Sequence, residues 1–157
     1  MDSMASDSDF MNYALREAEK AFRKNEVPVG AVLVIDNEII ARSFNKRESA
    51  YDPTAHAELL ALRAAGRLTR NWRLCDATLY VTKEPCIMCA GAMVNARLGR
   101  LVFGCRDSKG GGVKSLYNLL SDKRLNHQVE IASGVLEKEC ASLLKQFFQA
   151  KRASNHC

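Results

Sequence analysis

Thr82-Lys83-Glu84-Pro85-Cys86-Ile87-Met88-Cys89 joins two segments whose residue types predict different structures. Residues 77–82 are mostly β-branched, aromatic or aliphatic, which predicts a strand. Residues 86–96 are rich in alanine and contain a glycine, which predicts a helix that packs closely against a sheet. The chain is therefore expected to run from a strand directly into a helix whose first turn carries two cysteines spaced C-x-x-C.

Further metal-binding side chains lie upstream, in His56-Ala57-Glu58. A catalytic zinc ion takes three protein ligands and keeps its fourth tetrahedral position for water. His56, Cys86 and Cys89 are the expected ligands, and Glu58 is left as a proton carrier. The pattern predicts an enzyme with a catalytic zinc centre.

Each group of candidate ligands follows a segment typical of a helix start. Asp52-Pro53-Thr54 combines a capping side chain with a proline, and Glu84-Pro85 repeats this arrangement before Cys86. A helix N-terminus favours the thiolate, the form of cysteine that binds metal. On an ideal helix the side chains of His56 and Glu58 point about 200° apart. Both can reach one pocket only from the first turn.

Hydrophobic periodicity and turn residues assign the rest of the chain. Asp36-Asn37 is expected to turn a β-hairpin, and Gly66 to end the helix that carries His56. Helices are predicted at 10–24, 56–66, 86–96, 115–120 and 137–152, and strands at 29–35, 39–44, 77–82, 101–105 and 129–131. The alternation implies an α/β fold of three layers, α/β/α, with the metal site at the carboxyl ends of the strands.

Two further features of this assignment concern the C-terminal third. Residues 106–114 contain three consecutive glycines and are expected to form a mobile basic loop. The last helix should bury one apolar face, made by Leu136, Cys140, Leu143, Leu144, Phe147 and Phe148.

The length of 157 residues, 47% of them hydrophobic, suits a single domain over residues 1–157 with a core of about 8–152. No apolar run is long enough to cross a membrane. The first eight residues are polar and lack the pattern of a secretory signal, so a cytoplasmic location with reduced thiols is expected.

The formal net charge of +5 fits an anionic partner without proving one. The cysteines outside the C-x-x-C pair need separate interpretations. Cys140 is expected in the core and Cys157 in a loose tail. Either Cys75 or Cys105, which flank predicted strands, would make the zinc structural if it were a fourth ligand. Packing roles are favoured for both.

The combination H-x-E and P-C-x-x-C resembles the zinc-dependent nucleobase deaminases. The resemblance to the bacterial tRNA adenosine deaminases extends over residues 10–152 and is carried by Val27–Val32, Asp52–Glu58, Leu79–Thr82, Pro85–Cys89, Ala90–Met93 and Asn126-His127. It implies a cytidine-deaminase-like fold with a central mixed five-stranded sheet. It also implies deamination of the wobble adenosine in the anticodon stem-loop of an arginine tRNA to inosine, by a homodimer with one Zn²⁺ per subunit.

The resemblance also implies roles for individual residues. His56, Cys86 and Cys89 would bind zinc, which activates a water for attack on C6 of adenine, while Glu58 moves the protons.

Other roles concern the substrate: Asn45 would orient the adenine, and Val29 would line its pocket. Asp107 of Arg106-Asp107 would contact the RNA sugar, and Lys109 and Arg152 would lie along the RNA path. On sequence alone, however, Asn45 is more often a turn residue and Arg106-Asp107 a surface ion pair.

Two residues depart from the family pattern: Lys83 stands where an apolar residue is usual, and Cys105 where alanine is. Both could tune substrate fit.

Two other functions stay open at this point. The zinc motif is shared by deaminases of free guanine, cytosine or cytidine, although the basic charge and the basic end of the last helix favour RNA. A non-catalytic zinc-containing RNA-binding subunit is the second alternative, and Glu58 argues against it.

Overall fold

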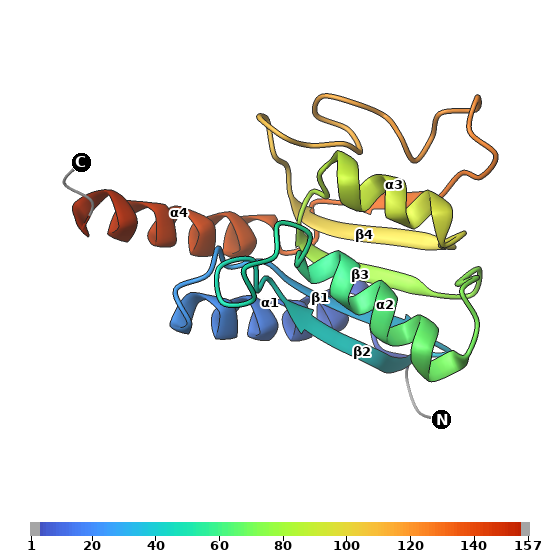
Figure 1. Cartoon of the computed structure of the whole chain (residues 1–157), viewed down its shortest axis with the longest axis horizontal. Coiled ribbons are helices and arrows are strands. Elements are labelled where there is room, and N and C mark those ends of the chain that lie inside the picture. The colour runs from blue at the N-terminus through green and yellow to red at the C-terminus, as the bar shows by residue number, and fades with distance from the viewer. Residues whose placement is uncertain (1–3, 155–157) are drawn as a thin grey trace.

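The computed structural model describes residues 4–154. In that part of the chain, helices and strands follow the predicted order except for the helix predicted at 115–120 (Figure 1). The helices are α1 (Asp7–Arg23), α2 (Ala57–Thr69), α3 (Ile87–Asn95) and α4 (Glu137–Ser154), and the strands are β1 (Gly30–Ile35), β2 (Glu38–Phe44), β3 (Thr78–Lys83), β4 (Arg100–Cys105) and β5 (Glu130–Ser133).

One mixed sheet joins the five strands in the order β2-β1-β3-β4-β5. Asp36 and Asn37 connect β1 to β2 with positive φ angles of 50° and 63°, the left-handed backbone that a two-residue hairpin turn requires. β1 pairs antiparallel with both β2 and β3, whereas β3, β4 and β5 are parallel. The predicted hairpin and mixed five-stranded sheet are confirmed.

Helices cover both faces of this sheet. α2 and α3 pack on one face over a core that includes Leu79, Leu101 and Phe103. α1 and α4 pack on the other, around Met11, Val102 and Cys140. Alternate residues of each strand point to opposite faces, so each central strand contributes to both cores. The three-layer α/β/α prediction is confirmed (Figure 1).

Helix α1 is fixed to the sheet at its first turn. Ser6 caps the helix in a reciprocal capping box with Asp9. Asp7 accepts hydrogen bonds from the hydroxyl of Tyr80 at 2.7 Å and from two guanidinium nitrogens of Arg100 at 2.8 and 2.9 Å. One ionic cluster thus ties α1 to β3 and β4.

The backbone of α1 also lies directly against the start of β1. A Cβ atom at Gly30 would collide with the carbonyl oxygen of Ala14. The absence of a side chain at Gly30 therefore permits this close approach.

Three local predictions are wrong. Helix α2 continues past Gly66 to Thr69, and Arg70 takes the left-handed conformation of the C-cap with φ 53°. Residues 115–120 form turns rather than a helix, because the amides of Leu116 and Tyr117 donate to the carbonyl of Gly111.

The third error concerns α4. Cys140 and Phe147 are buried as expected, and Phe147 packs against Phe22 of α1. Phe148 is 43% exposed, because successive residues of a helix point about 100° apart and Phe148 faces another side than Phe147. No helix among residues 4–154 has both the length and the apolar character to span a bilayer.

Asp7→Asn is expected to lower the free energy of unfolding by about 1 kcal/mol at neutral pH, because the bonds to Arg100 lose their charge assistance. These bonds hold the pKa of Asp7 below its ordinary value of 3.8. The stabilisation is therefore complete above that pH and is lost as the pH falls through the lowered pKa. Urea denaturation across acid pH should show wild type and variant converging. Glu19→Gln, on the exposed side of α1, is the control and should change little; a gap that persists in acid would contradict this role for Asp7.

Candidate metal centre and adjoining pocket

Two helix N-termini meet at one edge of the sheet. His56 is the N-cap of α2 and Cys86 is the N-cap of α3, and neither uses its side chain as a cap. Their side chains are therefore available to a ligand. Asp52 and Glu84, the residues expected to cap these helices, are therefore not the N-caps. The side chain of Asp52 instead accepts hydrogen bonds from the amide and hydroxyl of Thr54 in a turn that precedes α2. Pro85 likewise precedes the N-cap.

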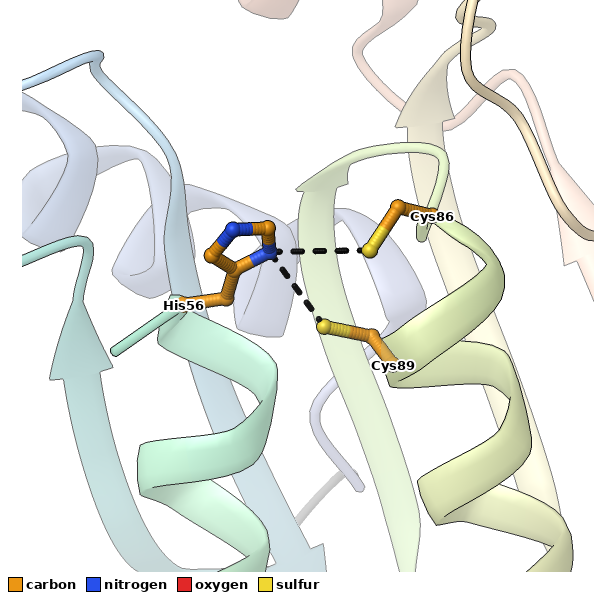
Figure 2. A group of neighbouring side chains, drawn as sticks. All are labelled: His56, Cys86 and Cys89. Atoms are coloured by element: carbon orange, nitrogen blue, oxygen red, sulfur yellow. Dashed lines mark hydrogen bonds between the residues drawn. The ribbon is translucent and has the colours of Figure 1, made fainter. Parts of the chain in front are cut away.

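The structure brings His56, Cys86 and Cys89 together (Figure 2). Nδ1 of His56 lies 3.6 Å from Sγ of Cys86 and 3.5 Å from Sγ of Cys89, and all three ligand atoms lie within 4.8 Å of one another. Tetrahedral zinc with ordinary Zn–N and Zn–S bond lengths places its nitrogen and sulfur ligands about 3.6 Å apart. The donor set and the spacing both fit a zinc ion.

The protonation of these ligands also suits a cation. A hydrogen bond from the thiol of Cys89, together with one involving His56, lowers the pKa of Cys86 to about 3 although partial burial opposes this. The shared bond and burial raise the pKa of Cys89. The hydrogen bond to Cys86 raises the pKa of His56. Without metal, the Cys86 thiolate is thus hydrogen-bonded to Cys89 and His56, and a divalent metal can displace the protons that these groups share.

Neither cysteine considered as a fourth ligand reaches this group. Cys105 is buried on the opposite face of the sheet, in the α1 and α4 core, and its thiol donates to the carbonyl of Thr82. Cys75 is exposed, so the packing role expected for it is wrong. Cys157 lies outside the described residues. Within residues 4–154, the group that can hold a metal has three protein ligands.

A cavity of about 280 Å³ opens beside the metal ligands. Glu58, 4% exposed, lies on its wall with His56 and Cys86. Burial raises the pKa of the Glu58 carboxyl above its usual range. A carboxyl whose pKa is raised by burial holds a proton more readily than a carboxyl in water, which suits a group that accepts and then returns protons.

Asn45 and Val29 also line this cavity. So do Arg47, which the sequence did not single out, and Phe148, which was expected in the buried face of the last helix. The amide of Asn45 is held by the chain itself: Nδ2 donates to the carbonyl of Val27 at 3.3 Å, and Oδ1 accepts from the backbone of Arg47 at 3.2 Å. The side chain is thus fixed at the cavity wall.

The loop that carries Asn45 is held by a buried carboxylate. Glu26, 1% exposed, accepts from the backbone amides of Glu48 and Ser49 at 2.9 and 2.7 Å. Glu26 was not identified from the sequence, because only the fold brings its carboxylate to these amides.

A second cavity shares part of its lining with the first and is strongly basic. Lys83, Asp107 and Phe148 lie on both, and the remaining lining residues of the second are Lys109, Gly110, Lys145, Lys151 and Arg152. Two predicted RNA-path residues, Lys109 and Arg152, therefore share one groove. Arg106 is exposed and lines neither cavity, and the ion partner of Asp107 is Lys83, not Arg106.

Comparisons with known proteins agree with this geometry. The family model of MafB19-like deaminases matches residues 5–152. A tRNA-specific adenosine deaminase of Bacillus subtilis is 52% identical over 149 residues, which is 95% of this chain and 92% of the relative. The chain belongs to the tRNA-specific adenosine deaminase family. A second member, from Streptococcus pyogenes serotype M1, is 45% identical over 96% of this chain and 88% of its own length.

A solved structure gives the same result for the fold. It comes from studies of A-to-I editing by tRNA:A34 deaminases at the wobble position of transfer RNA. It superposes with a TM-score of 0.83 at 46% identity and covers 85% of this chain and 97% of that one. The cytidine-deaminase-like fold predicted from the resemblance is confirmed.

In this family member a buried carboxylate connects the metal ligands to the basic groove. Glu84, 2% exposed, accepts from the backbone amides of Asp107, Val113, Lys114 and Ser115 at 2.8–3.2 Å and from the hydroxyl of Ser115. Burial alone would raise the pKa of Glu84, but these hydrogen bonds outweigh it and lower the pKa to about 2. The carboxylate is ionised at neutral pH.

The three consecutive glycines lie in the loop that Glu84 holds. A Cβ atom at Gly111 would collide with the carboxylate of Glu84, and one at Gly112 would crowd the backbone of Cys86 and Ile87. The amide of Gly112 donates to the carbonyl of Pro85 at 2.8 Å. Close packing therefore explains the absence of side chains at Gly111 and Gly112.

Glu84→Gln is expected to lower the free energy of unfolding by about 2 kcal/mol, since an amide carries no charge and cannot accept at its nitrogen. Hydrogen exchange at the amides of residues 113–115 should become faster than in wild type. Glu38→Gln, at the exposed start of β2, serves as the matched control. Unchanged protection of residues 113–115 would show that the carboxylate does not hold this loop.

Proposed function

We propose that the protein hydrolytically deaminates the wobble adenosine of a tRNA anticodon to inosine, as a single deaminase domain. The observation that carries the proposal is a His-Cys-Cys group and a buried glutamate at one small cavity that shares lining residues with a basic groove. The named activity of relatives at 45–52% identity supports it.

We propose one Zn²⁺ per chain, bound by His56, Cys86 and Cys89. Zinc in such a site supplies Lewis acidity and a water of lowered pKa. The N-terminus of α3 favours the thiolates, because Cys86 is its N-cap and Cys89 lies in its first turn, where the partial positive charge of the helix is located. The position of Cys86 depends further on the loop that Glu84 holds.

Glu58 is the proposed proton carrier. It lies on the wall of the cavity but is buried from bulk water, so protons that it accepts are retained within the site. In the hydrolysis a proton has to leave the attacking water, and others have to reach the ring nitrogen and the departing ammonia. One carboxyl beside the reacting carbon can perform these transfers in sequence.

The cavity is proposed to bind the adenine base. Its volume of about 280 Å³ suits a group smaller than a typical drug-sized ligand. Val29 supplies an apolar wall, and Asn45 supplies an amide whose orientation is fixed by its bonds to Val27 and Arg47. The apolar wall would contact the flat face of the base, and the fixed amide would hydrogen-bond to one of its edges, so together they would determine how the base is oriented.

The basic groove is proposed to bind the anticodon stem-loop of an arginine tRNA. Lys109 and Arg152 would meet backbone phosphates, as would Arg106, which is exposed beside the groove. Asp107 would contact the ribose 2′-OH, a group that distinguishes RNA from DNA. We further propose a homodimer, on family resemblance, and a cytoplasmic location, because the substrate is tRNA.

Two other functions remain as alternatives for the experiment. A deaminase of free bases would use the same metal group and Glu58, but it would have no need for the five basic side chains in the groove. A non-catalytic RNA-binding subunit would have no need for a buried carboxyl at the cavity.

The deciding experiment measures inosine formation by the zinc-loaded protein on an arginine-tRNA anticodon stem-loop, with free adenosine, guanine and cytidine in parallel. Inosine at the wobble position alone is the expected result. Turnover of only a free base or nucleoside would overturn the RNA assignment, and no turnover with zinc bound would indicate the non-catalytic subunit.

Glu58→Ala is expected to reduce turnover by at least about a hundredfold, because the protons then lack a carrier. Zinc content and stem-loop affinity should stay near those of wild type. Glu58→Gln, which keeps the volume of the side chain, should be equally inactive. Loss of the metal or of folding in both variants would contradict the assigned role.

Asp107→Asn is expected to lower the preference for RNA over the matching DNA stem-loop by roughly tenfold, the effect of one hydrogen bond to the 2′-OH. Folding should change little, because Asn retains the Oδ1 acceptor for the amides of Lys109 and Gly110. Relative kcat/KM on the two stem-loops is the measurement. Equal effects of the substitution on RNA and DNA would show that the sugar contact was assigned wrongly.

A further inference from the structure

Lys83 lies at the wall between the two cavities. It is the last residue of β3, paired in register with Cys105 at the end of β4. Its side chain lines both the cavity beside the metal ligands and the basic groove. Nζ of Lys83 is 3.2 Å from Oδ2 of Asp107, and both side chains are partly buried, at 28% and 21% exposure.

The carboxylate of Asp107 is held from two sides, which fixes the position of the lysine. Its Oδ1 atom accepts from the backbone amides of Lys109 and Gly110 at 3.1 and 3.2 Å, and its Oδ2 atom meets Lys83. Because the loop amides determine where the carboxylate lies, the ammonium group of Lys83 is directed to one place in the wall.

The ammonium group has more donors than Asp107 uses. A lysine carries three N–H donors and no acceptor, and a carboxylate at Oδ2 engages one of them. The groove beyond contains further cations, including Lys109, Lys145 and Arg152, and among residues 4–154 Asp107 is its single acidic lining residue. Excess positive charge next to a half-buried ammonium group favours a second anionic ligand at Lys83.

The lining that the two cavities share defines that ligand. A base bound beside His56 and Glu58 is attached to a ribose and to two phosphodiesters, and Lys83, Asp107 and Phe148 are the residues that face both this base and the basic groove. A ribose that contacts Asp107 brings one of its phosphodiesters next to the lysine, which is bound to the same carboxylate.

We propose that Lys83 is a phosphate-binding residue that holds one phosphodiester adjacent to the extruded nucleotide. This inference rests on the proposed function and deepens it. Lys83 ties phosphate recognition to the sugar contact through Asp107, so the site prefers a nucleotide within a chain to a free nucleoside. An ion pair without this role would only orient Asp107.

The experiment measures binding of a labelled arginine-tRNA anticodon stem-loop by fluorescence anisotropy over a range of salt. The stem-loop carries inosine at the wobble position, so it cannot be turned over. Lys83→Met should weaken binding about fivefold at about 0.1 M salt and reduce the log–log salt slope by about 0.7, the effect of one phosphate contact to a single strand. Lys138→Met removes the same charge from the exposed first turn of α4, outside both cavities, and should leave the slope unchanged.

Neutral methylphosphonate linkages identify the phosphate. One linkage next to the wobble nucleotide should weaken binding to wild type, and the same linkage should have no further effect on Lys83→Met. Additive losses at every linkage would overturn the proposal. The double variant Lys83→Met/Asp107→Asn tests whether an unpaired Asp107 simply repels the RNA. Recovery of the wild-type salt slope in the double variant would overturn the proposal, and a slope that stays reduced supports the proposal.

Failure of this inference is distinguishable from failure of the proposed function. A wild-type protein that forms inosine and binds the stem-loop, with no linkage dependent on Lys83, would overturn the inference alone. A wild-type protein that does not bind the stem-loop would overturn both.

Discussion

Two helix N-termini have to meet at one edge of the sheet before an imidazole and two thiols can lie within bonding distance of one ion. The parallel pairing of β3 with β4 and the connection from β2 into α2 impose this meeting. Because each N-cap supplies its side chain to the site rather than to its own helix, the amides at both helix ends stay without a side-chain cap and contribute local positive potential. The same amides stabilise the anionic form of the ligands, so backbone geometry and ligand chemistry reinforce each other.

Buried carboxylates fix the loops around this site. Glu84 satisfies consecutive amides of the segment that carries Asp107, and Glu26 does the same for the segment that carries Asn45. A buried amide without a partner is costly, so each carboxylate determines where its loop can lie. These contacts make loops that lack regular structure precise enough to position substrate-facing side chains.

The sequence predicted features that depend on interactions between residues close in the chain better than features that depend on distant residues. The hairpin turn at Asp36-Asn37 and the C-x-x-C helix start depend on residues close in the chain. The turn is found where local chemistry placed it, and the helix begins within one residue of its predicted start. The turns at 115–120 escaped prediction because a glutamate 31 residues away binds the amide of Ser115. The end of α2 beyond Gly66 escaped it because glycine is tolerated within a helix at a cost of only about 1 kcal/mol.

The pairing of Lys83 with Asp107 was hidden for the same reason. The two residues come from the ends of adjacent strands, and their separation in sequence gives no sign of their contact. Lys83 could be recognised as unusual from the sequence, but its meaning required the two cavities.

The close contact at Gly30 limits how the pocket can diversify. The strand start beside Val29 is pressed against the backbone of α1, so this wall cannot shift without displacing a whole helix. Variants selected for a different base would have to reshape the pocket through side chains on its loops and on α4, such as Arg47 and Phe148. Helix α1 thus constrains one side of the pocket, and substitutions that change the base specificity are expected on the other side.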